Sequence, residues 1–310
     1  MKKSVLVIAL ALGVTGAFAQ DLTSKKGEPM LPEAEDWAIS MNADPIFQFV
    51  GNAFSGYTGK NTAPGVNWMN GNRTIIGKKF IDEKNAYRVL VRLGFTNESY
   101  KNMVADNSIA TPAVFPAQDP EATDKFSKKN TTIGIGVGKE MRRGKTRLQG
   151  YYGADAMIWI SGSSEKFTYG NTMTAVPSGA GFTSTPTTTT WNDTTGAVTG
   201  EILATSRITK MKSGMTFGIG VRGFIGAEYF IFPKIAIGAE YGWGIGFQTS
   251  GKGKAVTETT GGPGPVVGQQ DAITSGSSKF GFDTDLNQGT IFGFKGSNTG
   301  TASLRVTFHF

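Results

Sequence analysis

The segment TFGIGVRGFIGAEYF, from Thr216 to Phe230, contains the spacing G-x-G-x-x-G at Gly218, Gly220 and Gly223. A dinucleotide-binding turn requires such glycines to open a helix whose N-terminal amide groups face a pyrophosphate. This segment instead alternates, with an apolar side chain at every second position from Phe217 except at Gly223. The positions between them hold three glycines, an arginine, a glutamate and Phe224, which is the only large apolar residue among them. Because a period of two belongs to a β-strand, we predict a strand here and reject the nucleotide site.

The same alternation recurs along the chain. It is most complete from Ile235 to Gln248, which follows the first segment after only residues 231–234. A strand of this length is long enough to cross a membrane, which needs about nine to eleven residues. Lys78 and Lys79 fall on opposite faces of another expected strand, so the facing of that strand stays open. The eight expected strands cover residues 37–43, 73–80, 86–95, 133–138, 147–160, 216–230, 235–248 and 302–310.

The connections between these strands alternate between short and long. Three are short, at 81–85, 139–146 and 231–234, and four are long, at 44–72, 96–130, about 161–209 and about 249–300. Outer-membrane barrels have tight periplasmic turns, long extracellular loops and an even number of strands. The sequence therefore predicts an all-β fold, an eight-stranded antiparallel transmembrane β-barrel over residues 36–310, with ten strands as the alternative. Within the third long loop, the threonine-rich segment from Thr183 to Thr195 is expected to be a flexible, exposed tip.

The start of the chain has the pattern of an export signal. Lys2 and Lys3 precede an apolar run at residues 5–14, and Ala17-Phe18-Ala19 forms a small-x-small cleavage site. We therefore expect a signal peptide at 1–19, followed by a periplasmic N-terminal segment at 20–35. Loss of the two lysines lowers the formal charge from +7 to +5, and the remaining basic residues are dispersed, which does not indicate a nucleic-acid partner. The absence of cysteine excludes disulfides, thiolate metal sites and a cysteine nucleophile.

Several segments together resemble the small outer-membrane β-barrel proteins of Bacteroidota, which are broadly similar to the OmpX, OmpW and OmpA barrels. They are TIIGKKFIDEKNAYRVLVRLGF at 74–95, RRGKTRLQGYYGADA at 142–156, SLRVTFHF at 303–310 and the export signal. The resemblance implies a location in the bacterial outer membrane, surrounded by outer-membrane lipid and lipopolysaccharide. It also implies that the barrel-assembly machinery recognises the terminal strand through Phe310, supported by Phe308.

The inward positions of the expected barrel carry charges of both signs. An eight-stranded barrel has an interior just wide enough for its own side chains, so opposite charges inside it must pair. This pattern favours a closed lumen and a structural or surface-interaction role, with an extracellular or host ligand bound by the loops. The alternative is a narrow diffusion channel for small anionic solutes. The expected lumen charges are Arg88, Arg92, Arg147, Asp155, Arg222, Glu228, Glu240 and Arg305.

No catalytic, cofactor or metal site is predicted, and we do not expect an enzyme. His309 is the only histidine and has no serine and acid in register with it, because Ser303 lies six residues away. The stretch from Asp283 to Asn287 begins like a calcium-binding loop. Position twelve of that loop is Phe294 where a glutamate is needed, so a turn is expected instead.

Overall fold

The computed structural model describes residues 22–24, 26–43, 75–107, 116–118, 120–173, 186–193, 195–260, 268–283 and 302–310. Their regular structure is entirely β, and they contain no helix that is long and apolar enough to cross a membrane. The signal-peptide prediction and residues 284–287 of the calcium-like stretch lie outside the described residues. The strands are β1 (Trp37–Asn42), β2 (Ile75–Asp82), β3 (Asn85–Ala105), β4 (Glu121–Arg143), β5 (Leu148–Thr168), β6 (Thr187–Trp191), β7 (Val198–Leu203), β8 (Ser206–Lys212), β9 (Thr216–Phe232), β10 (Ile235–Ser250), β11 (Gly253–Thr259), β12 (Gly268–Thr274), β13 (Ser277–Asp283) and β14 (Ala302–His309).

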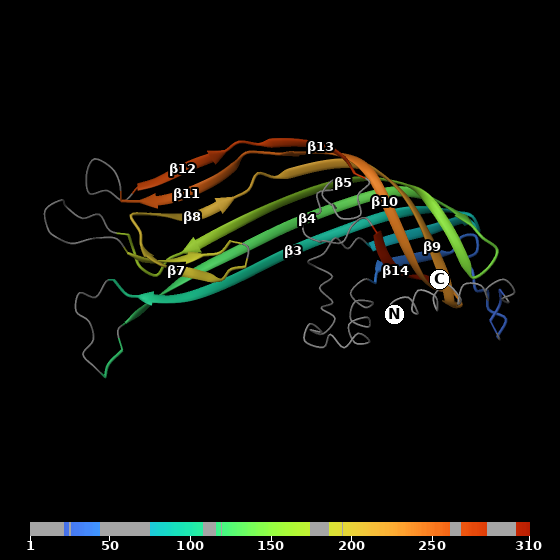
Figure 1. The fold of residues 1–310 in the computed structure, drawn as a ribbon, viewed down its shortest axis with the longest axis horizontal. Helices are drawn as coiled ribbons and strands as arrows, with labels where there is room; N and C mark the ends of the chain where they lie inside the picture. The colour runs from blue at the N-terminus through green and yellow to red at the C-terminus, as the bar shows by residue number, and fades with distance from the viewer. Residues whose placement is uncertain are drawn as a thin grey trace, which may run out of the picture.

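Eight strands form a closed ring of antiparallel pairs, at the right of Figure 1. The order is β1-β2-β3-β4-β5-β9-β10-β14, and β14 pairs with β1 to close the ring. Each of the eight predicted segments supplies one of these strands, so the all-β prediction and the ring of eight are confirmed. The β2–β3, β4–β5 and β9–β10 turns lie at one end, called here the turn end. Phe310 also lies there, since Trp37 and Phe310 exchange backbone hydrogen bonds of 2.8 and 2.9 Å.

The prediction of long loops was wrong over much of the described chain. Strands β3, β4 and β5 contain 21, 23 and 21 residues and continue far beyond the ring. There they join β8, β11 and β12 in the order β12-β11-β8-β5-β4-β3, at the left of Figure 1. We call this part of the sheet the extension. At roughly 3.3 Å per residue, β3 to β5 are about 70 Å long, whereas the part of β5 that pairs with β9 in the ring, from Leu148 to Ser161, is about 46 Å long.

A hairpin of β6 and β7 covers part of the inner face of the extension. Thr188 and Thr189 of β6 are buried, and Thr189 donates hydrogen bonds from its backbone N–H and its hydroxyl to the Asp124 carboxylate, both at 2.8 Å. Trp191 lies beside Phe126, with 5.8 Å between the ring centroids. The expectation of a flexible, exposed threonine tip was therefore wrong for the five residues of β6.

The outer face of the ring exposes apolar side chains on every one of its strands, as the alternation predicted. Val137 is 64% exposed and Tyr87 is 58% exposed. We call this surface the apolar belt. Its main members are Trp37, Ile39, Ile75, Tyr87, Val89, Leu93, Phe95, Ile135, Val137, Ile158, Ile160, Phe217, Ile219, Val221, Ile225, Ile245, Phe247, Leu304 and Phe308.

Glycine is required where strands β9 and β10 approach each other inside the ring. A Cβ added at Gly238 would lie 2.6 Å from the backbone oxygen of Ala227 and 2.7 Å from Cγ of Glu228. At Gly77, by contrast, the nearest atom would be the backbone oxygen of Val89 at 3.9 Å. The two glycines therefore differ in whether their strand can accept a methyl group.

We expect Gly238→Ala to lower the free energy of unfolding by about 1–3 kcal/mol, because the added methyl group overpacks the β9–β10 ladder. Gly77→Ala is the matched control and should change stability little. Urea unfolding of the refolded variants measures both effects. Equal losses at the two positions would contradict the packing described here.

Candidate functional site

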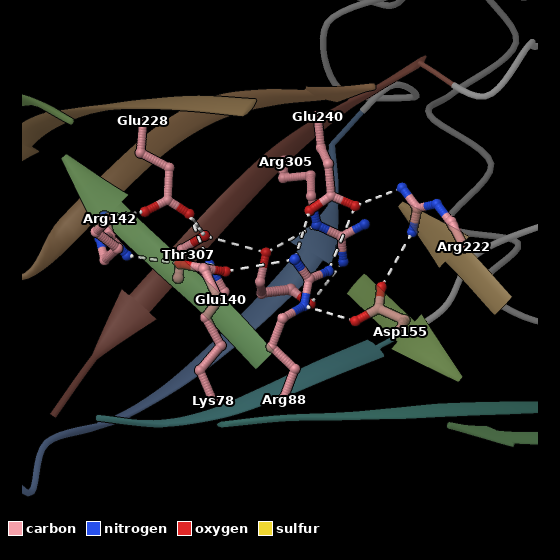
Figure 2. A network of polar contacts seen from close by, with 11 residues as sticks. Lys78, Arg88, Glu140, Arg142, Asp155, Arg222, Glu228, Glu240, Arg305 and Thr307 are labelled. Atoms are coloured by element: carbon pink, nitrogen blue, oxygen red, sulfur yellow. Dashed lines mark hydrogen bonds and ion pairs between the residues drawn. The ribbon is translucent and has the colours of Figure 1, made fainter. Parts of the chain in front are cut away.

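Nine charged side chains meet inside the ring and form what we call the ionic cluster. Figure 2 shows them converging from different strands around a shared interior. All are buried except Arg222, whose side chain is 15% exposed. They come from seven of the eight ring strands, and β1 contributes the uncharged Ser40. The members are Lys78, Arg88, Glu140, Arg142, Asp155, Arg222, Glu228, Glu240 and Arg305.

In the half of the cluster nearer the turn end, two cations share two carboxylates. Nζ of Lys78 lies 2.9 Å from Glu140 and 3.0 Å from Glu228. The guanidinium of Arg142 lies 3.1 Å from Glu140 and 2.7 Å from Glu228. The hydroxyl of Thr307 donates a further hydrogen bond to Glu228 at 3.1 Å. Each charge therefore has two opposite partners.

The second half repeats this arrangement with two arginines. Arg88 lies 3.0 Å from Glu240 and 3.4 Å from Asp155. Arg222 lies 2.6 Å from Glu240 and 3.5 Å from Asp155. A contact of 3.4 Å between Arg88 and Glu140 links the two halves. The result is one continuous network of alternating charge across the ring.

Arg305 adds a fifth cation to the four carboxylates, so the cluster carries a formal charge of +1. Its Nε donates to the Ser40 hydroxyl at 2.9 Å and its guanidinium to the Ser40 carbonyl at 3.1 Å. Aromatic rings also contact the cations, with Arg88 3.8 Å from the Phe224 ring centroid and Lys78 4.9 Å from that of Tyr151. Such cation–π contacts favour the charged state away from bulk water.

Apolar layers lie on both sides of the ionic cluster. The β2–β3 register places Lys78 opposite Arg88, with the pair Ile76 and Leu90 on one side and the pair Phe80 and Ala86 on the other. Away from the turn end, Ile76 and Leu90 pack with Met157 and Trp159. At the turn end, Met30 of the N-terminal segment is buried against Phe230 and Ala236. The cluster is thus enclosed above and below as well as around its circumference.

The structure brings together six of the eight lumen charges predicted from the sequence: Arg88, Asp155, Arg222, Glu228, Glu240 and Arg305. Arg92 lies four residues beyond Arg88, on the same buried face of β3. Arg147 lies instead in the turn before β5, where it is half-buried and takes no part in the ion pairs between described residues. Its position in a turn removes it from the strand alternation that suggested an inward side chain.

Sequence reasoning missed Lys78, Glu140 and Arg142. Glu140 and Arg142 continue the face of Gly134, Gly136 and Gly138 along β4, which runs to Arg143, whereas the expected strand ended at residue 138. Extending the alternation would have found both.

The ambiguity at Lys78 is now resolved. Lys78 points inward, whereas Lys79 points outward to a contact of 3.1 Å with the exposed Glu35. The side-chain types alone could not distinguish the two positions.

The terminal strand places its remaining candidate residues as the alternation predicted. His309 is buried, with its ring 5.5 Å from that of Phe80 and 5.2 Å from that of Phe230. Its Nδ1 lies 3.2 Å from the backbone oxygen of Lys234. Phe308 and Phe310 are exposed on the outside of the turn end. This geometry gives His309 a packing role.

A second group of buried polar side chains lies in the extension, under the β6–β7 hairpin. Arg207 of β8 donates to Glu258 at 3.1 Å and to the backbone oxygen of Asn171 at 2.7 Å, and it lies 4.4 Å from the ring centroid of Tyr169. Burial raises the pKa of the Tyr169 phenol to about 12. These contacts hold Tyr169 and Asn171, which directly follow β5, against β8.

No protein-family model matches the chain, and neither a curated protein nor a solved structure does. The function must therefore be inferred from the ring, its interior and its surfaces.

We expect Lys78→Met to lower the free energy of unfolding by about 3–5 kcal/mol, because it leaves Glu140 and Glu228 with a buried excess of negative charge. The adjacent Lys79→Met is the control and should cost less than about 1 kcal/mol, since its ion pair is exposed. Denaturant unfolding of the two variants separates these outcomes. Similar stabilities would show that the cluster does not hold the ring together.

Proposed function

We propose that this protein is an integral outer-membrane β-barrel with a closed, charge-filled lumen, and that it serves a structural or surface-interaction role through the sheet beyond the barrel. The observation that carries the proposal is the inverted ring, which is apolar outside and ionic inside. A water-soluble protein would have the reverse arrangement.

Membrane insertion is supported by the size of the apolar belt. Soluble monomers rarely expose a continuous apolar patch larger than a few hundred Å², whereas this belt includes every strand of the ring. On β3 it runs from Tyr87 to Phe95. Nine residues at about 3.3 Å each, tilted by about 40°, span roughly 23 Å, close to the apolar band of about 25 Å in outer-membrane barrels. Beyond Phe95 the outward residues of β3 become Asn97, Ser99 and Lys101.

A closed lumen is supported by the network and the layers around it. A solute crossing the ring would have to separate ion pairs as short as 2.6 Å and displace the apolar layer that contains Leu90 and Trp159. Breaking buried pairs is costly, so we favour a closed barrel over a channel. The net positive charge of the cluster favours the alternative of a narrow path for small anions, which we retain as the second candidate.

The proposed outer-membrane location is supported by an expected export signal and by the aromatic residue after the closing strand. The export signal expected at residues 1–19 would deliver the protein to the periplasm, and the exposed aromatic Phe310 ends the strand that closes the ring. In our proposal the barrel-assembly machinery reads this strand end. The turn end would then face the periplasm, and the extension would stand outside the cell as a platform for an extracellular or host ligand.

Ile135→Arg should reduce the free energy of folding into lipid vesicles by about 2–4 kcal/mol, because Ile135 lies opposite Val91 in the middle of the belt, where it would meet hydrocarbon. Val198→Arg is the matched control, since Val198 is also exposed but lies on β7 outside the ring. Equal tolerance of the two changes in folding titrations would sink the membrane assignment.

In planar bilayers, the folded protein should give no steady conductance of porin size, because the ionic cluster and its apolar layers fill the ring. Single-channel recording measures this directly. A small, reproducible, anion-selective current would replace the closed barrel with the narrow-channel alternative.

A further inference from the structure

Lysines gather on the outward face of the extension, directly beyond the apolar belt. The β3–β4 register runs without a shift from Phe95 opposite Thr131 to Lys101 opposite Lys125, so the belt and these lysines share one side of the sheet. All of the lysine side chains in the group are exposed. We call Lys101, Lys125, Lys129, Lys166, Lys210 and Lys212 the lysine face.

The strand register places like charges opposite one another on this face. Lys101 is the direct cross-strand partner of Lys125, and Lys166 is the partner of Lys210. Lys212 lies between Ser164 and Lys254. Like charges directly opposite each other destabilise a sheet, so this arrangement does not serve the fold.

The described part of the chain provides few carboxylates to neutralise this positive charge. Lys254, at the margin, forms an ion pair of 2.7 Å with Asp271. Among the described residues, no carboxylate lies within ion-pair distance of the six members of the lysine face. The other face of the same strands differs, since Lys128 there is paired with Glu165 at 3.6 Å. The unbalanced charge is therefore confined to the face that continues the belt.

The distance of the lysines from the edge of the apolar belt indicates which part of a membrane they would contact. Lys129 lies two residues beyond the row of Phe95, and Lys101 lies six residues beyond Phe95. At about 3.3 Å per residue these steps are roughly 7 and 20 Å along the strand. On each side of the hydrocarbon, the headgroup region of an ordinary bilayer is only about 5–8 Å thick, so it reaches the row of Lys129, and the rows up to Lys101 lie farther out. A phosphorylated headgroup with an acidic sugar extension would therefore lie beside the rows of lysines.

We propose that the lysine face binds the phosphorylated glycolipid of the outer leaflet, the chemical class of lipopolysaccharide, and so anchors the extension against the membrane surface. The inference rests on the proposed membrane insertion, and it adds a specific lipid partner and the residues that select it. Lysine ammonium groups bind phosphate as point charges, so several lysines spread over four strands suit a ligand with several separated anionic groups.

The test is an equilibrium titration of fluorescent bisphosphorylated lipid A into the full folded protein in zwitterionic micelles. K166Q/K210Q/K212Q should weaken binding about tenfold or more, since each lysine near an anionic surface contributes appreciably. The turn-end variant K84Q/K139Q/K145Q is the matched control and should bind like the wild type. K166R/K210R/K212R should retain affinity, which separates charge from altered folding.

Three outcomes would overturn the proposal. The first is equal affinity of the wild type for lipid A and its dephosphorylated counterpart, and the second is unchanged lipid A affinity in K166Q/K210Q/K212Q. The third is a loss of heparin binding in that variant without a loss of lipid A binding, which would indicate a soluble acidic polysaccharide as the ligand. Flotation of the wild type with phosphatidylcholine vesicles tests membrane insertion separately, because these vesicles carry no anionic headgroup. Flotation without selective lipid A binding would overturn only the lysine face, and failure to float would overturn the barrel itself.

Discussion

Mutual neutralisation of charge inside the ring is the constraint on which the rest of the structure depends. The effective cost of moving each ion out of water is several kcal/mol, and it is offset only where every ion has well-placed partners. Here Glu140 and Glu228 each contact two or more cations, and so does Glu240. Because the partners come from seven strands, no partial ring can satisfy them. Electrostatic satisfaction is thereby coupled to closure of the ring.

The same cluster fixes the strand register. A shift of one residue moves every side chain of a strand to the opposite face, because the side-chain period is two. On β2 such a shift would exchange Lys78 for Lys79, and would bring Ile76 and Phe80 to the outside. The buried carboxylates would then lose their partner, and the apolar layers next to them would be broken. Either face of an alternating strand could point into the ring, and the ionic cluster determines which face does.

The sequence predicted the ring well because most of its strands separate apolar from polar residues, although β2 does not. Along β3 the contrast between Val89 and Arg88 is unambiguous, and six of the nine charges of the cluster follow from such alternation. The extension lacks this contrast. In β4, Lys125 and Lys129 lie on one face while Asp124 and Lys128 lie on the other, so neither face looks buried. Pairing with strands already fixed in the ring supports this segment, and such support is a tertiary effect that local pattern does not report.

Threonine content misled the prediction for a related reason. A run of threonines has the composition of an exposed, low-complexity loop, and its burial depends on a partner distant in sequence. Asp124, 65 residues away, accepts two hydrogen bonds from Thr189 and one from the Gly170 backbone. Nothing near Thr189 in the sequence signals that contact, just as nothing near Lys78 distinguishes it from Lys79.

Strands β3, β4 and β5 run without interruption from the ring into the extension and so join these two parts of the molecule. The register set around Arg88 and Asp155 runs unbroken into the extension, so it also determines which residues of the extension face outward. The β6–β7 hairpin covers part of the inner face, where it is held by Asp124. The outward face therefore remains uncovered by the hairpin. Its lysines lie opposite one another because the ionic cluster fixes the register of the ring strands that continue into the extension. The buried ionic cluster thus determines how the exposed charges of the lysine face are arranged.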